Sequence, residues 1–321
     1  MLEILNPDLV RGRIRHALFD FDGTISLVRE GWQGVMIPMM VELLMQTPDH
    51  EDEAAIEAVV RDFVTRLTGK QTIYQMIQLA EEVARRGGAP LEPIAYKYMY
   101  LDRLSTRVDE RLAALRAGAT DPDELMVPGS RAMLAELRER DVRCYLASGT
   151  DEPFVLAEAA ALGVTSFFEG IYGAQDDYKS FSKKMVIDRI IAAHGLAGPE
   201  FVGFGDGYVE IEDTRRVGGI AVGVATDEAR RTGIDEWKRR RLIEAGADLI
   251  VPDFGERYIS TGALPDLAEV GSLVAEAHTR YRDDRRGACS DVYPALAEVP
   301  PTGRGEEATW RRSHRATGTC S

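Results

Sequence analysis

The sequence has little cysteine and no long apolar run, and each shortage excludes a class of protein. Three cysteines occur among 321 residues, widely spaced at Cys144, Cys289 and Cys320. An odd number without paired spacing argues against a disulfide framework or a zinc site and favours a reducing, cytoplasmic setting. The longest apolar runs, such as GGIAVGVA at 218–225, fall far short of the roughly 20 residues that a transmembrane helix needs. We therefore expect neither a membrane span nor, from the mixed-charge N-terminal segment, a secretory signal.

Basic residues are also fewer than acidic ones. Lys and Arg total 39 against 53 Asp and Glu, which gives a net charge of −14. Such a protein repels nucleic-acid backbones and anionic membranes, so we expect neither as a partner. An anionic ligand would need positive charge supplied locally by a metal ion, backbone N–H groups or a lysine. The apolar content of 45% is that of a folded, water-soluble protein.

The apolar periodicity predicts an α/β protein. Residues 14–22, IRHALFDFD, form an apolar run that ends in carboxylates, as a buried parallel strand opening into a loop does. Further strands are predicted at 142–147, 170–173, 201–204, 220–224 and 248–251, and helices at 130–140, 153–162, 183–195 and 208–217. Strands alternating with helices predict a Rossmann-like parallel sheet covered on both faces.

A long helical stretch interrupts this alternation after the first strand. From about Glu30 to Ala117, apolar residues recur three and four positions apart. At the other end of the chain, the sequence is rich in Arg, Gly, Pro and Ser without periodicity, as in disordered segments. We predict three parts: an α/β core (1–28 and 127–283), an inserted helical cap (29–126) and a disordered C-terminal tail (284–321).

Polar residues follow three of the predicted strands. Asp20, Ser148 and Asp206 each come directly after an apolar run. Ligands of such sheets bind outside the carboxyl ends of the strands. The three residues are therefore predicted to meet at one site, over which the inserted helices would form a lid.

Four segments in fixed order carry a family resemblance. They are Asp20-Phe21-Asp22-Gly23-Thr24, Ser148 in YLASGT, a lysine in SKKMVIDRI, and Gly205-Asp206-Gly207-Tyr208-Val209-Glu210. The set resembles the four motifs of the haloacid dehalogenase superfamily, in the branch similar to phosphoglycolate phosphatase and β-phosphoglucomutase, whose members carry a helical cap.

The resemblance implies a Mg²⁺-dependent phosphatase. Asp20 would be the nucleophile that is transiently phosphorylated, and Asp22 the acid and base that protonates the leaving oxygen and then activates water. The Asp20 carboxylate, the Asp22 carbonyl and Asp206 would hold the metal ion. Glu210 stands where the family has a second aspartate, so it either binds the metal through water or shapes the loop.

The resemblance also assigns residues to the phosphoryl oxygens. The Ser148 hydroxyl and the neighbouring N–H groups of Gly149 and Thr150 would bind them, together with the motif lysine. Lys183, 23 residues before Asp206, matches the family layout better than Lys184, which stays an alternative.

The predicted cap supplies candidates for substrate recognition. Gly69, Lys70 and Gln71 lie in a break between two predicted helices, where similar caps dip into the active site; Lys70 could equally be a solvated lysine beside a capping glycine. Arg29, at the hinge, either binds a substrate anion bidentately or forms a salt bridge to the acidic insert.

These features predict hydrolysis of a small phosphorylated metabolite, such as a sugar or cyclitol phosphate. One alternative is a sugar phosphomutase similar to β-phosphoglucomutase, but Trp32 stands where those enzymes have a histidine, ten residues after the acid/base aspartate. Another is a non-catalytic binding module on the same fold, although both Asp20 and Asp206 are present. The oligomeric state is not readable from the residues.

Overall fold

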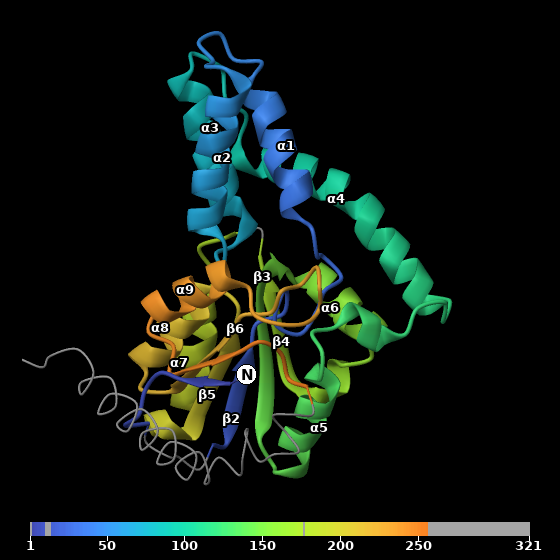
Figure 1. Ribbon diagram of the computed structural model, residues 1–321, viewed down its shortest axis with the longest axis vertical. Helices are drawn as coiled ribbons and strands as arrows, with labels where there is room; N and C mark the ends of the chain where they lie inside the picture. Colours follow the sequence, from blue (N-terminus) through green and yellow to red (C-terminus); the bar gives the residue numbers. More distant parts are fainter. Residues whose placement is uncertain (1, 10–13, 176, 256–321) are drawn as a thin grey trace, which may run out of the picture. The chain divides into compact units, whose positions relative to one another are not determined.

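The computed structural model describes residues 2–9, 14–175 and 177–255, whose centre is a seven-stranded sheet (Figure 1). The strand order is β1-β7-β6-β5-β2-β3-β4. All neighbours pair in parallel except β1, which is antiparallel to β7 at the edge. The strands are β1 (Glu3–Ile4), β2 (His16–Phe19), β3 (Arg143–Asp151), β4 (Phe168–Ala174), β5 (Phe201–Gly205), β6 (Ile220–Val224) and β7 (Leu249–Val251).

The predicted α/β fold with its parallel sheet is confirmed, but the end of β3, the strand β1 and the helix α9 (Glu236–Glu244) differ from the predictions. The strand predicted at 142–147 ends at Ala147, but β3 continues to Asp151, and its pairing with β4 shifts register between Ala147 and Asp151. The two-residue strand β1 was not predicted, because two residues carry no periodicity. The predicted tail, 284–321, lies outside the described residues.

Helices cover both faces of the sheet. Figure 1 shows α5 and α6 on one side and α7, α8 and α9 on the other. Local signals set their ends: the Ser182 hydroxyl accepts the Met185 N–H at the start of α7, and Gly195, with φ +59°, ends it. The helices are α5 (Ser130–Glu139), α6 (Glu152–Ala161), α7 (Lys183–His194), α8 (Tyr208–Arg216) and α9 (Glu236–Glu244).

Between β2 and α5 the chain is almost wholly helical, as the periodicity predicts. Its α-helices are α1 (Gln33–Leu44), α2 (Glu53–Leu67), α3 (Thr72–Arg85) and α4 (Pro93–Arg116). In α3 the buried residues Ile73, Met76, Leu79 and Val83 repeat at helical spacing, so one face packs inward. Short 3₁₀ turns lie at Pro122–Leu125, Thr165–Phe167 and Gly198–Glu200. The division into core and cap domains stays a prediction.

The central strand β2 is buried along its whole length. Phe19 stacks on Phe204 of β5, with ring centroids 4.5 Å apart, and burial of such a ring contributes about 1.5–3 kcal/mol. Phe19 is also in register with Leu146 of β3. The residues after these three positions therefore emerge at one edge of the sheet. Among the described residues, no helix is long and apolar enough to cross a membrane.

Candidate active site

The residues that follow β2 and β5, together with residues 148–150 at the end of β3, line one cavity of about 110 Å³. The structure thus brings together the three strand ends that the sequence places at one site. The predicted site residues that line this cavity are Asp20, Asp22, Arg29, Gly69, Lys70, Ser148, Gly149, Thr150, Lys183 and Asp206. Gln71 and Glu210 are not among its lining residues.

Asp20 lies directly beyond β2 and is 5% exposed. Its Oδ1 accepts a hydrogen bond of 2.7 Å from the Phe21 N–H and lies 2.8 Å from the Lys183 Nζ. Burial raises the pKa of the Asp20 carboxyl well above its usual value; Lys183 lowers it, and the Glu210 and Asp206 carboxylates raise it again. The Asp20 anion therefore depends on positive charge nearby.

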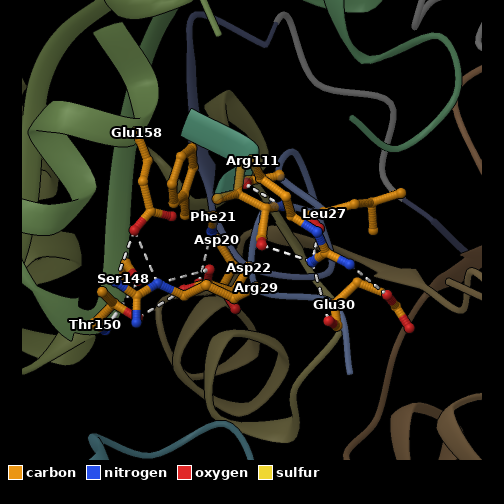
Figure 2. Close-up of polar contacts among 12 residues, drawn as sticks. Asp20, Phe21, Asp22, Leu27, Arg29, Glu30, Arg111, Ser148, Thr150 and Glu158 are labelled. Atoms are coloured by element: carbon orange, nitrogen blue, oxygen red, sulfur yellow. Dashed lines mark hydrogen bonds and ion pairs between the residues drawn. The ribbon is translucent and has the colours of Figure 1, made fainter. Parts of the chain in front are cut away.

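Asp22 is held by the neighbouring strand. Its Oδ2 accepts hydrogen bonds from the Ser148 hydroxyl at 3.1 Å and the Thr150 hydroxyl at 2.9 Å (Figure 2). Its Oδ1 is buried without a hydrogen bond in the described part of the chain, 3.9 Å from the Arg29 Nε. The Ser148 hydroxyl therefore orients Asp22. That the same hydroxyl also binds a phosphoryl oxygen stays a prediction.

Lys183 rather than Lys184 reaches the site. The side chain of Lys183 is 5% exposed, and its ammonium contacts both Asp20 and Glu210. Burial lowers the pKa of Lys183, but the two carboxylates outweigh this and raise it above its usual value. Lys184 is turned outward and pairs with Asp188 at 3.0 Å.

Glu210 is fully buried and does not line the cavity. Its Oε1 accepts from Lys183, and its Oε2 has no hydrogen bond among the described residues. Glu210 therefore acts on the cavity through its contact with Lys183, which lines it. Whether Glu210 also reaches a metal ion stays a prediction.

Arg29 forms a buried ion pair with the core. Its Nε and Nη2 lie 2.9 and 2.6 Å from the same Glu158 oxygen, on α6 (Figure 2). Its guanidinium also lies 5.4 Å from the Phe154 ring centroid. Burial raises the pKa of the Glu158 carboxyl to about 7, while Arg29 lowers it and Asp22 raises it. The salt bridge expected to the helical insert is thus made to α6, outside residues 29–126.

A further contact fixes the segment that carries Arg29. Arg111 of α4 donates to the carbonyls of Val28 at 2.7 Å and Glu30 at 3.1 Å, and pairs with the Glu30 carboxylate at 3.0 Å (Figure 2). Residues 28–30 are therefore bound both to α4, through Arg111, and to α6, through the Arg29–Glu158 ion pair.

Two residues at this site were not predicted, Lys238 and Glu228. The Lys238 Nζ lies 2.7 Å from Asp206 Oδ2 and also contacts Glu228, which lines the cavity. Burial lowers the pKa of Lys238, but Asp206 and Glu228 raise it above its usual value. The sequence gives little local signal for this cluster, because Lys238 lies in a highly charged segment that resembles an exposed helix.

The loop between α2 and α3 packs on glycines of the core. A Cβ added to Gly149 would lie 3.1 Å from the Lys70 carbonyl oxygen, and one added to Gly69 would lie 3.3 Å from the Gly207 Cα. Gly69 also has a φ of +97°, which side chains disfavour. Contact this close requires small residues on both sides.

Lys70 and Gln71, neighbours in this loop, make different contacts. The Lys70 ammonium lies 5.6 Å from the Tyr74 ring centroid, and Lys70 lines the cavity. The Gln71 amide instead donates to the carbonyls of Tyr178 at 3.1 Å and Phe181 at 2.8 Å. Gln71 therefore holds the loop against the core.

The chemistry of the lining residues suits a hard divalent cation. Asp20, Asp206 and Glu228 bring carboxylate oxygens to one cavity, and oxygen ligands are those that Mg²⁺ prefers. Each of the two lysines, Lys183 and Lys238, is paired with two carboxylates. When all six groups are ionised, two negative charges are therefore left unbalanced. No group of three or more His, Cys, Asp or Glu side chains arranged to hold a metal ion occurs within the described ranges, and Asp20, Asp206 and Glu228 are each paired with a lysine.

A family model confirms the resemblance carried by the motifs. The model for haloacid dehalogenase-like hydrolases matches residues 14–218. The chain belongs to this family, whose matched region contains the strands β2 to β5 and the cavity residues up to Asp206.

Solved structures of low sequence identity share the fold. A predicted phosphoglycolate phosphatase from Haemophilus somnus 129pt has a TM-score of 0.52 at 15% identity, over 78% of this chain and 99% of that one. A predicted phosphatase from Clostridium acetobutylicum has a TM-score of 0.51 at 17% identity, over 78% and 99%. At these identities the likeness shows the fold alone.

One curated protein matches a short segment. Glutaminase 2 from Yersinia pestis is 54% identical over 43 residues. The chain spans 13% of that relative's length, and the match covers 13% of this chain. So short a match shows no shared activity.

Proposed function

We propose that this hydrolase is a Mg²⁺-dependent phosphatase that cleaves a small phosphate monoester through an aspartyl-phosphate on Asp20. The observation that carries the proposal is the pair of carboxylates in one cavity, each in its own environment. Asp20 is buried against the Lys183 ammonium, whereas Asp22 is held by two hydroxyl groups. Two such carboxylates can divide the roles of nucleophile and proton carrier.

In the first step, an Asp20 carboxylate oxygen attacks phosphorus, and the bond from phosphorus to the ester oxygen breaks. Asp22, protonated at this stage, gives its proton to the leaving oxygen, so the alcohol departs neutral. The Lys183 ammonium is placed to stabilise negative charge that builds up beside Asp20.

In the second step, Asp22 as a carboxylate takes a proton from water, and the water oxygen attacks phosphorus. The bond from phosphorus to Asp20 breaks, which releases inorganic phosphate and restores both residues. Ser148 and Thr150 keep Asp22 in one orientation throughout.

The Asp20 carboxylate, the Asp22 carbonyl and Asp206 would hold Mg²⁺. The ion would offset the repulsion between an anionic nucleophile and an anionic phosphoryl group. The two negative charges left unbalanced in the lysine clusters support a divalent cation over a monovalent one.

A small substrate suits a cavity of about 110 Å³. The net charge of −14 supports a metabolite rather than a nucleic acid, and the free Cys144 is consistent with the cytoplasm. Sugar or cyclitol phosphates form the expected class, and the likeness to the predicted phosphoglycolate phosphatase from Haemophilus somnus adds phosphoglycolate as a substrate to test. Trp32 lines the cavity and cannot exchange protons as a histidine does, which favours hydrolysis over a phosphomutase reaction.

Release of inorganic phosphate from a panel of phosphorylated metabolites and from para-nitrophenyl phosphate tests the proposal. We expect turnover by the purified full chain with Mg²⁺ and none by Asp20→Asn. Equal turnover by both proteins would contradict it, and so would no turnover of any ester by the wild type.

A further inference from the structure

Each of two buried lysines bridges two carboxylates at the candidate active site. Lys183 pairs with Asp20 and Glu210. Lys238 pairs with Asp206 and Glu228. The mechanism uses Lys183 but assigns nothing to Lys238, although Lys238 contacts the carboxylate that would bind the cation.

Lys238 lies at the capped start of α9, and its side chain is largely buried. Lys238 is in the first turn of α9, where the Asp235 carboxylate accepts the N–H groups of Trp237 at 2.8 Å and Lys238 at 3.0 Å. The Lys238 side chain is 10% exposed, and it does not line the cavity. Its ammonium therefore lies behind the two carboxylates, not in the space that a substrate would fill.

Both partners of Lys238 lie against the loop that carries Asp22. A Cβ added to Gly23 would lie 2.3 Å from Asp206 Oδ2 and 3.0 Å from Glu228 Oε1. With φ at +75°, Gly23 lets the two carboxylates reach the loop. The Lys238 ammonium thus holds the Asp206 and Glu228 carboxylates close together beside this loop.

We infer that Lys238 is a positioning residue of the cation site: it holds Asp206 and Glu228 beside the Gly23 loop and, by its charge, limits the affinity of the site for Mg²⁺. The inference rests on the proposed function, since it takes Asp206 as a ligand. Glu228 compensates part of the charge of Lys238 and keeps the site attractive to a cation.

The direction of the effect follows from Coulomb's law. A unit positive charge next to a ligand carboxylate repels a divalent ion strongly in a partly buried site. Removal of the Lys238 charge should tighten Mg²⁺ binding, and removal of the Glu228 charge should weaken it. A weakly held ion would make the enzyme responsive to changes in the Mg²⁺ concentration.

Isothermal titration of the full chain with MgCl₂ measures this directly. We expect Lys238→Gln to lower the Kd for Mg²⁺ by about tenfold or more and Glu228→Gln to raise it by about tenfold. The double variant should return close to the wild-type Kd. Lys238→Arg, which keeps the charge, should bind Mg²⁺ nearly as the wild type does.

Lys97→Gln is the matched control. Lys97 is also buried and pairs with one carboxylate, Asp151, at 2.5 Å, but neither residue lines the cavity. Both lysine variants should melt at a lower temperature without Mg²⁺. With saturating Mg²⁺, Lys238→Gln should gain more in melting temperature than the wild type gains, and Lys97→Gln should gain the same.

An unchanged or higher Kd in Lys238→Gln would overturn the inference while leaving the phosphatase proposal intact, provided that the wild type binds Mg²⁺ and releases phosphate. If the wild type neither binds Mg²⁺ nor hydrolyses any ester, both fall together. If it hydrolyses esters without binding Mg²⁺, the role of Lys238 falls and the cation requirement with it.

Discussion

The Ser148 hydroxyl donates a hydrogen bond of 3.1 Å to the Asp22 carboxylate, although 126 positions separate the two residues in the chain. Thr150 donates to the same oxygen at 2.9 Å. Both donors belong to β3, so the strand next to β2 decides where the proposed acid and base points. The site is assembled by sheet pairing rather than by the loop alone.

The first prediction concerns this orientation. Thr150→Val removes one donor to Asp22 but keeps the backbone N–H that bonds Ser148. Because a mispositioned acid and base transfers protons less well, kcat for para-nitrophenyl phosphate should fall about tenfold with little change in KM. Thr150→Ser should restore most of the rate. Wild-type kinetics in Thr150→Val would show that this contact does not matter to turnover.

The second prediction concerns the metal. Phosphate release should stop with EDTA and return with Mg²⁺, and Asp206→Ala should raise the Mg²⁺ concentration for half-maximal rate at least about tenfold. Asp188→Ala removes an exposed carboxylate paired with Lys184 and serves as the control. If both variants respond to Mg²⁺ alike, Asp206 is not a ligand.

The third prediction separates two neighbours in the loop between α2 and α3. Lys70→Ala should lower kcat/KM for the native substrate but barely affect para-nitrophenyl phosphate, which offers nothing for the loop to recognise. Gln71→Ala should impair both substrates, because the Gln71 amide ties the loop to the carbonyls of Tyr178 and Phe181. A loss with both substrates in Lys70→Ala, and with the native substrate alone in Gln71→Ala, would show that Lys70 holds the loop and Gln71 recognises the substrate.

The fourth prediction concerns stability and pH. Burial, followed by the charges of His194, Arg143 and Arg15, lowers the pKa of His16 from 6.5 to about 4. Between these values the unfolded chain binds a proton at His16 that the folded chain refuses, so stability should fall as the pH falls from 6.5 to 4.

Melting temperatures across this pH range, compared between the wild type and His16→Phe, test the effect. The variant keeps an aromatic ring and should lose less stability toward low pH. Exchange of the exposed His50 for Gln is the control. Parallel curves for wild type and His16→Phe would exclude a contribution from His16.

The apolar pattern predicted the strands that are buried end to end. β2, β5 and β6 are largely apolar segments, and all three are buried along their whole length. The two-residue β1 and the charged helix α9 have no such pattern. β3 continues beyond its predicted end at Ala147 because pairing with β4, a contact between residues distant in the chain, extends it.

The sequence predicted the site residues that lie together in one segment. It did not predict the contacts between residues that are far apart in the chain. Asp20 and Asp22 share one loop, and each strand end could be read from its own segment. Lys183, which the family layout favours over Lys184, also shares the helix face of the buried Val186 and Ile187, a second local signal for the same choice. By contrast, Lys238 reaches Asp206 across 32 positions and Arg29 reaches Glu158 across 129.

The central claim is that Asp20 becomes phosphorylated. Asp22→Asn should slow hydrolysis of the phosphoenzyme, because no base activates water, and so let it accumulate during turnover of a phosphate ester. Reduction of the quenched protein with borohydride converts an aspartyl-phosphate to homoserine, which peptide mass spectrometry locates. The account predicts homoserine at position 20 in Asp22→Asn and none in Asp20→Asn; homoserine at another aspartate, or turnover without any phosphoenzyme, would contradict it.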